Sequence, residues 1–337
     1  MYNCTHHFAT FASIFGSPGL VCCSEEHGLI TEIQEKDKPE LNPPQHLITE
    51  VVSCNLCGAN QHTRLFTEEY NLQGSQAVLG INRCDQCKLV YVSPRLNQAS
   101  TSLVYRYDAE HTISHNYCWE GSSSNSRFAP LISRLEKTAR PGRLLDVGCG
   151  GGHFLQAAAK TGIWQVEGLE PSAEAAEQAR QFTNCKIKAC FLEEADFPEN
   201  HFSVISMLGV LEHLHNPTGI LRQVHHLLEE NGTLAVYVPN YSYLRLKDTG
   251  LLSRMRFGKS SHLCPQEHLF QYTQTTLINL LEESGFEVLR SDVGRPFVHG
   301  SRWKRTFKES AFLSVNLLKH LTGIHLGGLE VIARKSE

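Results

Sequence analysis

The sequence predicts an α/β fold, a doubly wound and mostly parallel sheet preceded by a small metal-binding unit. Three observations predict it. From residue 131 onward, apolar strand-like runs alternate with helix-like segments, the first of these strands runs into a glycine-rich loop, and two CxxC pairs precede them. Alternating strands and helices are typical of a parallel sheet that is covered by helices on both faces.

Length and composition fit a globular protein with one large and one smaller domain. The chain has 337 residues, of which 41% are hydrophobic, and its net charge is -4. The absence of a general positive charge argues against a dedicated nucleic-acid-binding protein. No apolar run reaches membrane-spanning length, and the weakly apolar stretch 8–23 lacks a preceding basic residue. We therefore expect a cytoplasmic protein without a transmembrane segment.

Changes in composition suggest the domain boundaries. Residues 1–50 show little periodicity and are expected to form a poorly ordered extension. Residues 51–95 contain the paired cysteines, and residues 96–130 form a connector whose aromatic residues either pack or fold over the site as a lid. The main domain covers residues 131–337, with an inserted, substrate-facing segment at 241–270.

Two cysteine pairs indicate a zinc site. Cys54 and Cys57 are separated from Cys84 and Cys87 by 26 residues (84 − 57 − 1). Two such pairs that face each other supply four thiolates in a tetrahedral array, and a site closed by four protein ligands is structural. The alternatives are four free or buried cysteines, and a redox pair, which is disfavoured because neither CxxC opens a helix in a βαβ context.

The alternation of elements can be followed residue by residue. Helices are predicted at 131–139, 152–161, 172–182, 217–228 and 273–284. Strands are predicted at 143–147, 165–169, 186–189, 202–208, 233–238 and 287–291. In such a sheet, ligands bind at the carboxyl ends of the strands, where the glycine-rich loop lies.

The run LLDVGCGGGHF, residues 144–154, is a strand, a glycine loop and a helix start. A dinucleotide fingerprint needs Gly or Ala where His153 stands, and the chain has no G-x-x-x-x-G-K-[ST] phosphate loop. Glu170 ends the next strand, where a carboxylate can accept hydrogen bonds from both hydroxyls of a ribose. Its alternative role is a negative charge at the start of the following helix. The loop therefore favours an adenosine-containing cofactor.

The motifs together resemble those of class I S-adenosylmethionine-dependent methyltransferases. They are LLDVGCGGGHF, VEGLEPS, FPENHFSVISMLGVLEHLHNP, LLEENGTLAVYVPN and EHLFQYTQTTLINLLEESGF. The chain is more narrowly similar to the branch in which a zinc-binding CxxC…CxxC unit runs into a VYVSPR-like segment. The resemblance implies a Rossmann-like fold with a zinc-ribbon-like unit, and methyl transfer by in-line displacement.

The resemblance also implies the cofactor-binding residues. The first motif would hold the methionine part of S-adenosylmethionine, through Asp146, Gly148, Gly150 and Gly152. Glu170 matches the ribose-binding acid. Phe191 occupies the adenine segment, where many relatives carry an acid, and Leu208 is expected close to the cofactor. Ser203 stands where an Asp is usual, a difference that we expect to affect structure more than chemistry.

The proposed catalytic residues follow the fourth strand and the basic segment. His213 is the first candidate base, Glu212 would orient it, and His268 matches a family position that faces the substrate. For both histidines a structural role is the alternative, and His215 is expected to be a loop residue. Whether a base is needed depends on the pKa of the acceptor.

Two later segments suggest partners. Segment 241–265 is basic, through Arg245, Lys247, Arg254, Arg256 and Lys259. It is either a solvated loop or a lid for a small anionic acceptor, such as a nucleotide-linked or lipid-linked sugar. Residues 303–321 can form an amphipathic helix, which we expect in a helix bundle or a homodimer contact rather than on a membrane.

Two other functions remain open. A zinc-ribbon methyltransferase that acts on RNA would need clustered basic residues on the zinc unit. The unit instead mixes both signs, with Arg64, Arg83 and Lys88 beside Glu68, Glu69 and Asp85. The second alternative is a cofactor-binding scaffold without catalysis, against which the intact glycine loop argues only in part.

Overall fold

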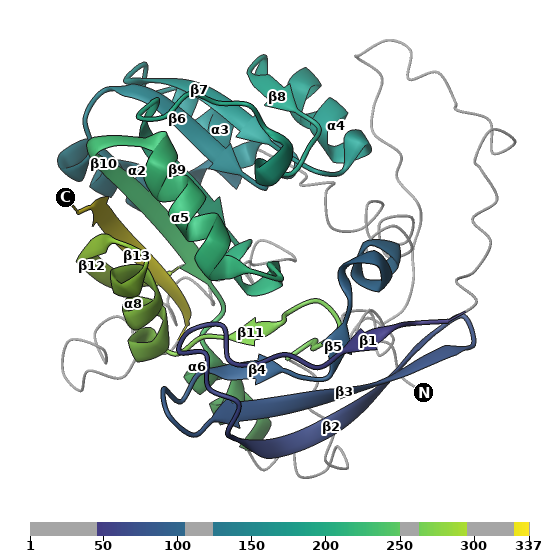
Figure 1. Cartoon of the computed structure of the whole chain (residues 1–337). Coiled ribbons are helices and arrows are strands. Elements are labelled where there is room, and N and C mark those ends of the chain that lie inside the picture. Colours follow the sequence, from purple (N-terminus) through teal and green to yellow (C-terminus); the bar gives the residue numbers. More distant parts are fainter. Residues whose placement is uncertain (1–45, 105–123, 250–262, 295–326, 337) are drawn as a thin grey trace, which may run out of the picture.

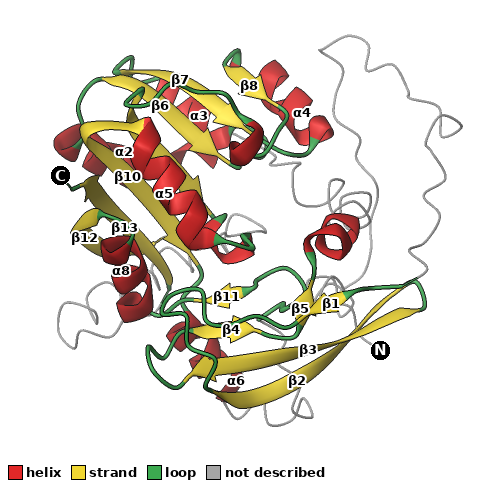
Figure 2. Cartoon of the chain, in the orientation of Figure 1, coloured by secondary structure: helices red, strands yellow, loops and turns green. Residues whose placement is uncertain are grey.

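The computed structural model describes residues 46–104, 124–249, 263–294 and 327–336. Two sheets dominate it, a large one with helices on both faces and a smaller one at its side (Figures 1 and 2). The described residues include no helix with the length and apolarity needed to cross a membrane. The predicted α/β class, with a mostly parallel sheet, is confirmed.

The large sheet has seven strands, in the order β12-β13-β10-β9-β6-β7-β8. Their bounds are β6 (Gly142–Val147), β7 (Trp164–Leu169), β8 (Lys186–Lys188), β9 (Phe202–Leu208), β10 (Leu228–Val238), β12 (Phe286–Gly294) and β13 (Gly328–Lys335). From β8 to β10 neighbouring strands pair in parallel, whereas β13 is antiparallel to both β10 and β12. The carboxyl ends of β6, β7 and β9 therefore lie along the same edge of the sheet.

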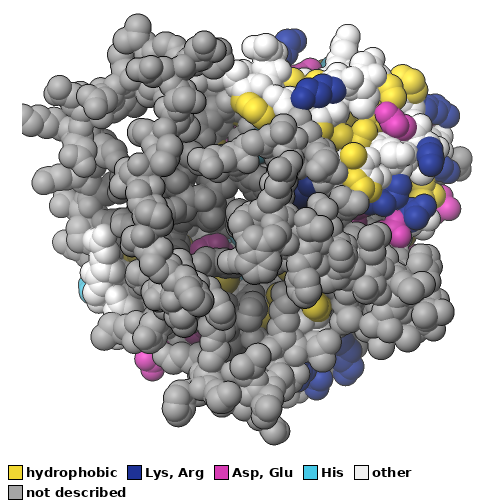
Figure 3. Space-filling view, turned by 180° about the vertical axis from the view of Figure 1, so that it is seen from behind, with side chains coloured by type: hydrophobic (Ala, Val, Ile, Leu, Met, Phe, Trp, Pro, Cys, Tyr) yellow, Lys and Arg dark blue, Asp and Glu magenta, His cyan; other side chains and the backbone are white. Residues whose placement is uncertain are grey.

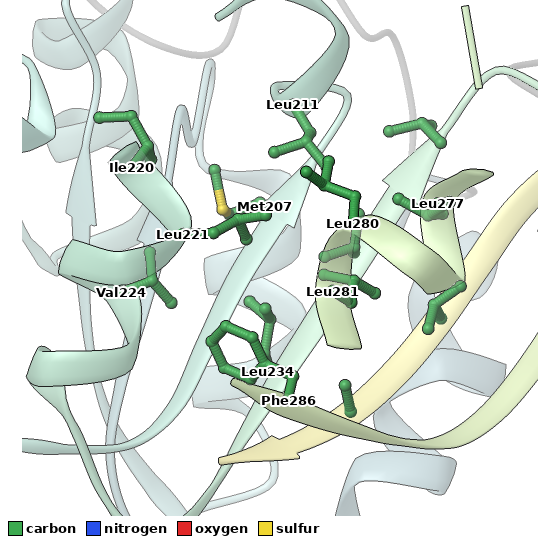
Figure 4. Packing of buried hydrophobic residues seen from close by; sticks show 14 of the residues in the cluster. Met207, Leu211, Ile220, Leu221, Val224, Leu234, Leu277, Leu280, Leu281 and Phe286 are labelled. Carbon is green, nitrogen blue, oxygen red and sulfur yellow. The ribbon is translucent and has the colours of Figure 1, made fainter. Parts of the chain in front are cut away.

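Helices cover both faces of this sheet. On one face lie α2 (Ser124–Thr138), α3 (His153–Ala159) and α4 (Ala173–Thr183), which share a buried cluster with β6 and β9. On the other face, α5 (Pro217–Leu227) and α8 (Gln274–Glu283) contribute apolar side chains that meet Met207, Leu234 and Phe286 of the strands (Figure 4). Burial of these side chains supplies the main stabilisation of the domain.

Local signals in the sequence account for several helix ends. The Ser172 side chain accepts a hydrogen bond from Ala175 N and caps the start of α4, and Asn184, with a φ of 56°, caps its end. The Asn216 side chain accepts a hydrogen bond from Gly219 N, and Pro217 occupies the first turn of α5. These are the residue types that helix ends favour, because they satisfy free backbone groups or adopt the left-handed conformation.

The smaller sheet belongs to the cysteine unit, but one of its strands comes from far along the chain. Its order is β11-β4-β3-β2, from β2 (His62–Leu72), β3 (Ser75–Cys84), β4 (Val90–Val92) and β11 (Phe270–Gln271). A separate short pair joins β1 (Thr49–Glu50) to β5 (Arg95–Leu96). β1 lies within the stretch 1–50 that was expected to be a poorly ordered extension, of which the structure describes residues 46–50. In Figure 1 the light green β11 lies beside the blue β4.

Candidate functional site

The glycine loop connects β6 to α3 and is folded tightly against β7. Gly148, Gly150 and Gly152 have φ values of 69°, 51° and 78°. At Gly152 a Cβ would come within 2.5 Å of the Thr183 methyl carbon, so both backbone angle and space require glycine there. Cys149 N donates to Leu169 O at 2.9 Å, which holds the loop at the end of β7.

Glu170 fixes the loop from the neighbouring strand end. One carboxylate oxygen accepts from Gly150 N and the other from Ser172 N, each at 2.9 Å. Glu170 is 8% exposed, and burial raises its pKa, while the two backbone hydrogen bonds oppose that rise. Each carboxylate oxygen can accept a second hydrogen bond, so a ribose could bind without breaking these contacts.

Asp146 lies deeper than Glu170. Its side chain accepts a hydrogen bond from the Ser206 hydroxyl at 2.6 Å, and burial raises its pKa to about 7. Asp146 therefore joins β6 to β9 directly beneath the loop. The hydroxyl of Ser203 donates to Arg143 O at 3.0 Å, which is the structural use expected for that position.

Phe191 follows β8 and Leu208 ends β9, and the strands β6 and β7 lie between β8 and β9 in the sheet. Phe191 is 45% exposed and precedes the short helix η4 (Leu192–Glu194), whose Glu194 carboxylate accepts from Phe191 N. Leu208 ends β9 and lines a cavity of about 20 Å³ together with Arg127 and Tyr237. The Arg127 guanidinium lies 5.8 Å from the Tyr237 ring centroid, and burial lowers its pKa to about 10.

A second group of polar side chains, the acid–histidine cluster, consists of Glu212, His213 and His268. Glu212 and His213 lie in the short helix η5 (Leu211–His213), and the His213 and His268 rings meet edge to face with centroids 4.6 Å apart. One potential ligand atom from each residue lies within 4.8 Å of the others. Glu212 Oε1 is 3.8 Å from His213 Nε2, too long for a hydrogen bond.

Burial keeps this cluster largely uncharged. Glu212 is 3% exposed, and burial raises its pKa to about 8. Burial lowers the pKa of His268 to about 4, and burial together with His268 lowers that of His213 well below its usual value. Within the described chain, Glu212 Oε2, His268 Nδ1 and the Tyr272 hydroxyl are buried without a hydrogen-bond partner. Such groups are costly unless a ligand or water satisfies them.

The four cysteines of the CxxC pairs come together. Sγ of Cys54 lies 3.4 Å from that of Cys87, and Sγ of Cys57 lies 3.4 Å from that of Cys84. All four sulfur atoms lie within 4.8 Å of one another. Tetrahedral zinc with Zn–S bonds of about 2.3 Å separates its sulfur ligands by about 3.8 Å, so the donor set and spacing fit Zn²⁺.

Comparison with known proteins identifies the family. A family model described as a methyltransferase domain matches residues 122–291, about half of the chain. This range contains the glycine loop, Glu170 and the acid–histidine cluster. The chain belongs to this methyltransferase family. This family agrees with the resemblance of the motifs to class I S-adenosylmethionine-dependent methyltransferases.

Curated relatives match this methyltransferase over part of their length. A ubiquinone biosynthesis O-methyltransferase of Glaesserella parasuis is 32% identical over 108 residues, which are 29% of this chain and 45% of that protein. An uncharacterized methyltransferase of Schizosaccharomyces pombe is 24% identical over 177 residues, which are 49% of this chain and 58% of that protein. The chain thus spans about half the length of these relatives.

Among solved structures, one similar chain is the 1,6-didemethyltoxoflavin-N1-methyltransferase of Burkholderia thailandensis. Its sequence is 19% identical, the match covers 80% of this methyltransferase and 100% of that chain, and the TM-score is 0.49.

Several predicted features lie outside the described residues. They are the connector aromatics Tyr105, Tyr107, Tyr117 and Trp119, the basic residues Arg254, Arg256 and Lys259, and the helix at 303–321. Of the basic segment, the described part includes α6 (Tyr241–Thr249).

Tyr272 and Arg127 were not among the site residues predicted from the sequence. Tyr272 stands in the quoted EHLFQYT motif, four residues after His268, so the signal was present but was not used. Arg127 precedes the part of α2 that the apolar pattern predicted, and no periodicity marked it.

Proposed function

We propose that the methyltransferase transfers a methyl group to a small-molecule acceptor that binds against the acid–histidine cluster of Glu212, His213 and His268. The observation that carries this proposal is the set of buried polar atoms without partners at that place. An acceptor with a hydroxyl group could satisfy them, because a hydroxyl both donates and accepts hydrogen bonds.

The cofactor would bind at the glycine loop. Glu170 would hold the ribose, the first motif the methionine part, Phe191 would pack near adenine, and Leu208 would lie close to the sulfonium. S-adenosylmethionine supplies an already activated methyl group. The protein therefore mainly aligns the acceptor atom with the S–CH₃ bond and excludes water.

Proton removal from the acceptor would fall to the acid–histidine cluster. Because the pKa of His268 is lowered to about 4, its ring is neutral at pH 7 and can accept a proton at the nitrogen that carries none. His213 is the alternative base, and Glu212, whose Oε1 lies 3.8 Å from His213 Nε2, would orient the histidines as a neutral acid, because its pKa of about 8 keeps it mostly protonated at pH 7. A positioned base with a pKa near the operating pH contributes about 10²- to 10⁴-fold in rate, and the contribution of His268 should be smaller because its lowered pKa makes the ring a weaker base.

Two observations bear on the chemical class of the acceptor. The ubiquinone biosynthesis O-methyltransferases among the relatives favour methylation of an oxygen atom on a small molecule. The basic segment 241–265 favours an anionic acceptor, such as a nucleotide-linked or lipid-linked sugar. RNA is less favoured, since basic, acidic and hydrophobic side chains are interspersed over the described face in Figure 3. We also propose that the four cysteines hold a structural Zn²⁺.

The test has two stages. Calorimetry with S-adenosylhomocysteine should show one site per chain. A screen with radiolabelled S-adenosylmethionine against catechols, hydroquinones and nucleotide-linked sugars should then find an acceptor. His268→Ala and His213→Ala are compared with His226→Ala, an exposed histidine on α5. Undiminished turnover in both cluster variants would remove the histidines from the mechanism, and cofactor binding with no labelled product in any class would favour a non-catalytic scaffold.

A further inference from the structure

The acid–histidine cluster is assembled from two segments that are held by the cysteine unit. The first, residues 211–218, follows β9 and carries Glu212 and His213. The second, residues 268–272, carries His268 and contains β11. Both segments contact the unit formed by residues 46–104, although they lie more than a hundred residues away in the chain.

Two side chains of the cysteine unit hold the end of the first segment. Arg95, only 7% exposed, donates from a terminal nitrogen to His215 O at 3.0 Å and from Nε to the Glu50 carboxylate at 2.8 Å. Asn55, located within the first CxxC, accepts from Thr218 N at 3.2 Å at the start of α5. A buried, charged donor on a carbonyl two residues after His213 restricts where η5 can lie.

The His215 ring completes this attachment. Burial first, and the nearby charge of Arg95 second, lower the pKa of His215, so its ring is neutral at pH 7. Nε2 of that ring lies 3.2 Å from Leu96 O, within hydrogen-bonding distance. His215 thus belongs to the attachment between the two units, as a loop residue.

Backbone pairing holds the second segment. In β11, Phe270 pairs with Tyr91 and Gln271 pairs with Val90 of β4, and Val92 N donates to Leu269 O at 2.9 Å. The strand that follows His268 is therefore an edge strand of the cysteine unit's sheet. The same buried cluster contains cysteine-unit and acceptor-side residues, namely Cys54, Cys84, Tyr91, Leu211, Leu269 and Tyr272.

The cofactor loop is held differently. Cys149 N donates to Leu169 O of β7, the Glu170 carboxylate accepts from Gly150 N and Ser172 N, and Glu170 N donates to Lys188 O of β8 at 3.1 Å. A small displacement of the cysteine unit would therefore act directly on the segments that carry His213 and His268, whereas these hydrogen bonds of the cofactor loop involve no residue of that unit.

We propose that Arg95 is a positioning residue for methyl transfer, which with Asn55 couples the cysteine unit to the acid–histidine cluster while leaving cofactor affinity unchanged. The inference rests on the proposed function of that cluster. A displacement of about 1 Å at a reacting centre costs on the order of 100-fold in rate, so turnover should respond strongly.

The central variant is Arg95→Met, which removes the guanidinium and keeps an apolar stem. Arg95→Lys is the conservative rescue, and Arg83→Met, at an exposed arginine on β3 of the same unit, is the matched control. Arg95→Met should lower kcat by about 10- to 100-fold. The dissociation constant for S-adenosylhomocysteine should stay within twofold of wild type, and Arg95→Lys should recover part of the loss.

A readout independent of turnover is the imidazole nitrogen NMR spectrum, with His213 and His268 assigned through single His→Gln variants. Arg95→Met should shift both signals, and Arg83→Met should shift neither. Asn55→Ala is a milder change at a half-buried residue and should shift the His213 signal. It replaces Arg95→Met as the test variant if Arg95→Met does not fold.

The outcomes separate the two proposals. Unchanged histidine signals in Arg95→Met and Asn55→Ala, or a parallel loss of cofactor affinity, would overturn the coupling. Shifted signals with retained cofactor affinity would support it even if the wild-type protein methylates no acceptor, a result that would overturn the proposed function alone.

Discussion

Replacement of Glu170 by glutamine tests the cofactor site most directly. The carboxylate accepts two backbone hydrogen bonds of 2.9 Å at 8% exposure. Glutamine keeps one acceptor oxygen and replaces the other by an NH₂ group, so one ribose hydroxyl would lose its charged acceptor and one backbone N–H of the loop would be left unpaired. Hydrogen bonds to charged groups contribute about 1.5–3 kcal/mol.

Converted to affinity, this loss corresponds to a dissociation constant about 10- to 150-fold higher. Calorimetric titration with S-adenosylhomocysteine at pH 7 measures it, and Glu230→Gln, at an exposed position near the start of β10, is the control. A folded Glu170→Gln protein whose affinity stays within threefold of wild type would refute the assignment of the ribose-binding acid.

The same variant should also remove a pH dependence. Burial raises the pKa of Glu170, so its carboxylate takes up a proton at a pH above the usual value for glutamate. Wild-type affinity for S-adenosylhomocysteine should therefore weaken as pH falls toward that pKa, because the protonated group accepts fewer hydrogen bonds. The affinity of Glu170→Gln should change less over the same range.

Three further predictions concern stability. Gly152→Ala forces a Cβ to within 2.5 Å of the Thr183 methyl carbon at a φ of 78°, and should lower the free energy of unfolding in urea by about 2–4 kcal/mol; an unchanged midpoint would contradict this loop geometry. Because burial raises the pKa of Glu212 from 4.5 to about 8, the unfolded chain releases this proton at lower pH than the native protein, and stability should fall as pH rises from 4.5 to 8. Glu212→Gln should reduce that loss by up to roughly 5 kcal/mol at pH 8, and parallel pH profiles of wild type and variant would disprove it. Metal analysis should find one zinc per chain, and a chelator or Cys57→Ser should remove it and the hydrogen-exchange protection of β2 and β3; a purified protein without zinc would exclude the site.

Much of the large sheet follows from local sequence patterns. The strand predicted at 202–208 coincides with β9, and the helix at 217–228 differs from α5 by one residue at its end. These elements combine regular apolar spacing with capping residues such as Asn216 and Pro217, so each can be recognised from its own residues.

Other features depend on contacts that no local pattern contains. The pairing of β11 with β4 joins residues about 180 positions apart, and a two-residue strand has no periodicity from which its sheet could be inferred. The antiparallel β13 was not predicted at all. For the site, the spacing of the four cysteines predicted their clustering, whereas the contact of Arg95 with His215 O depends on how the two sheets meet.

The pairing of β11 with β4 also has a consequence for chain synthesis and for protein engineering. The ribosome synthesises β4 long before β11. The β4 edge of the cysteine unit's sheet therefore stays unpaired until residue 271 has left the ribosome. A fragment ending at residue 104 would keep all four cysteines yet present the backbone groups of β4 to solvent and to other chains. The unit should therefore be transplanted between proteins only together with the segment 268–272.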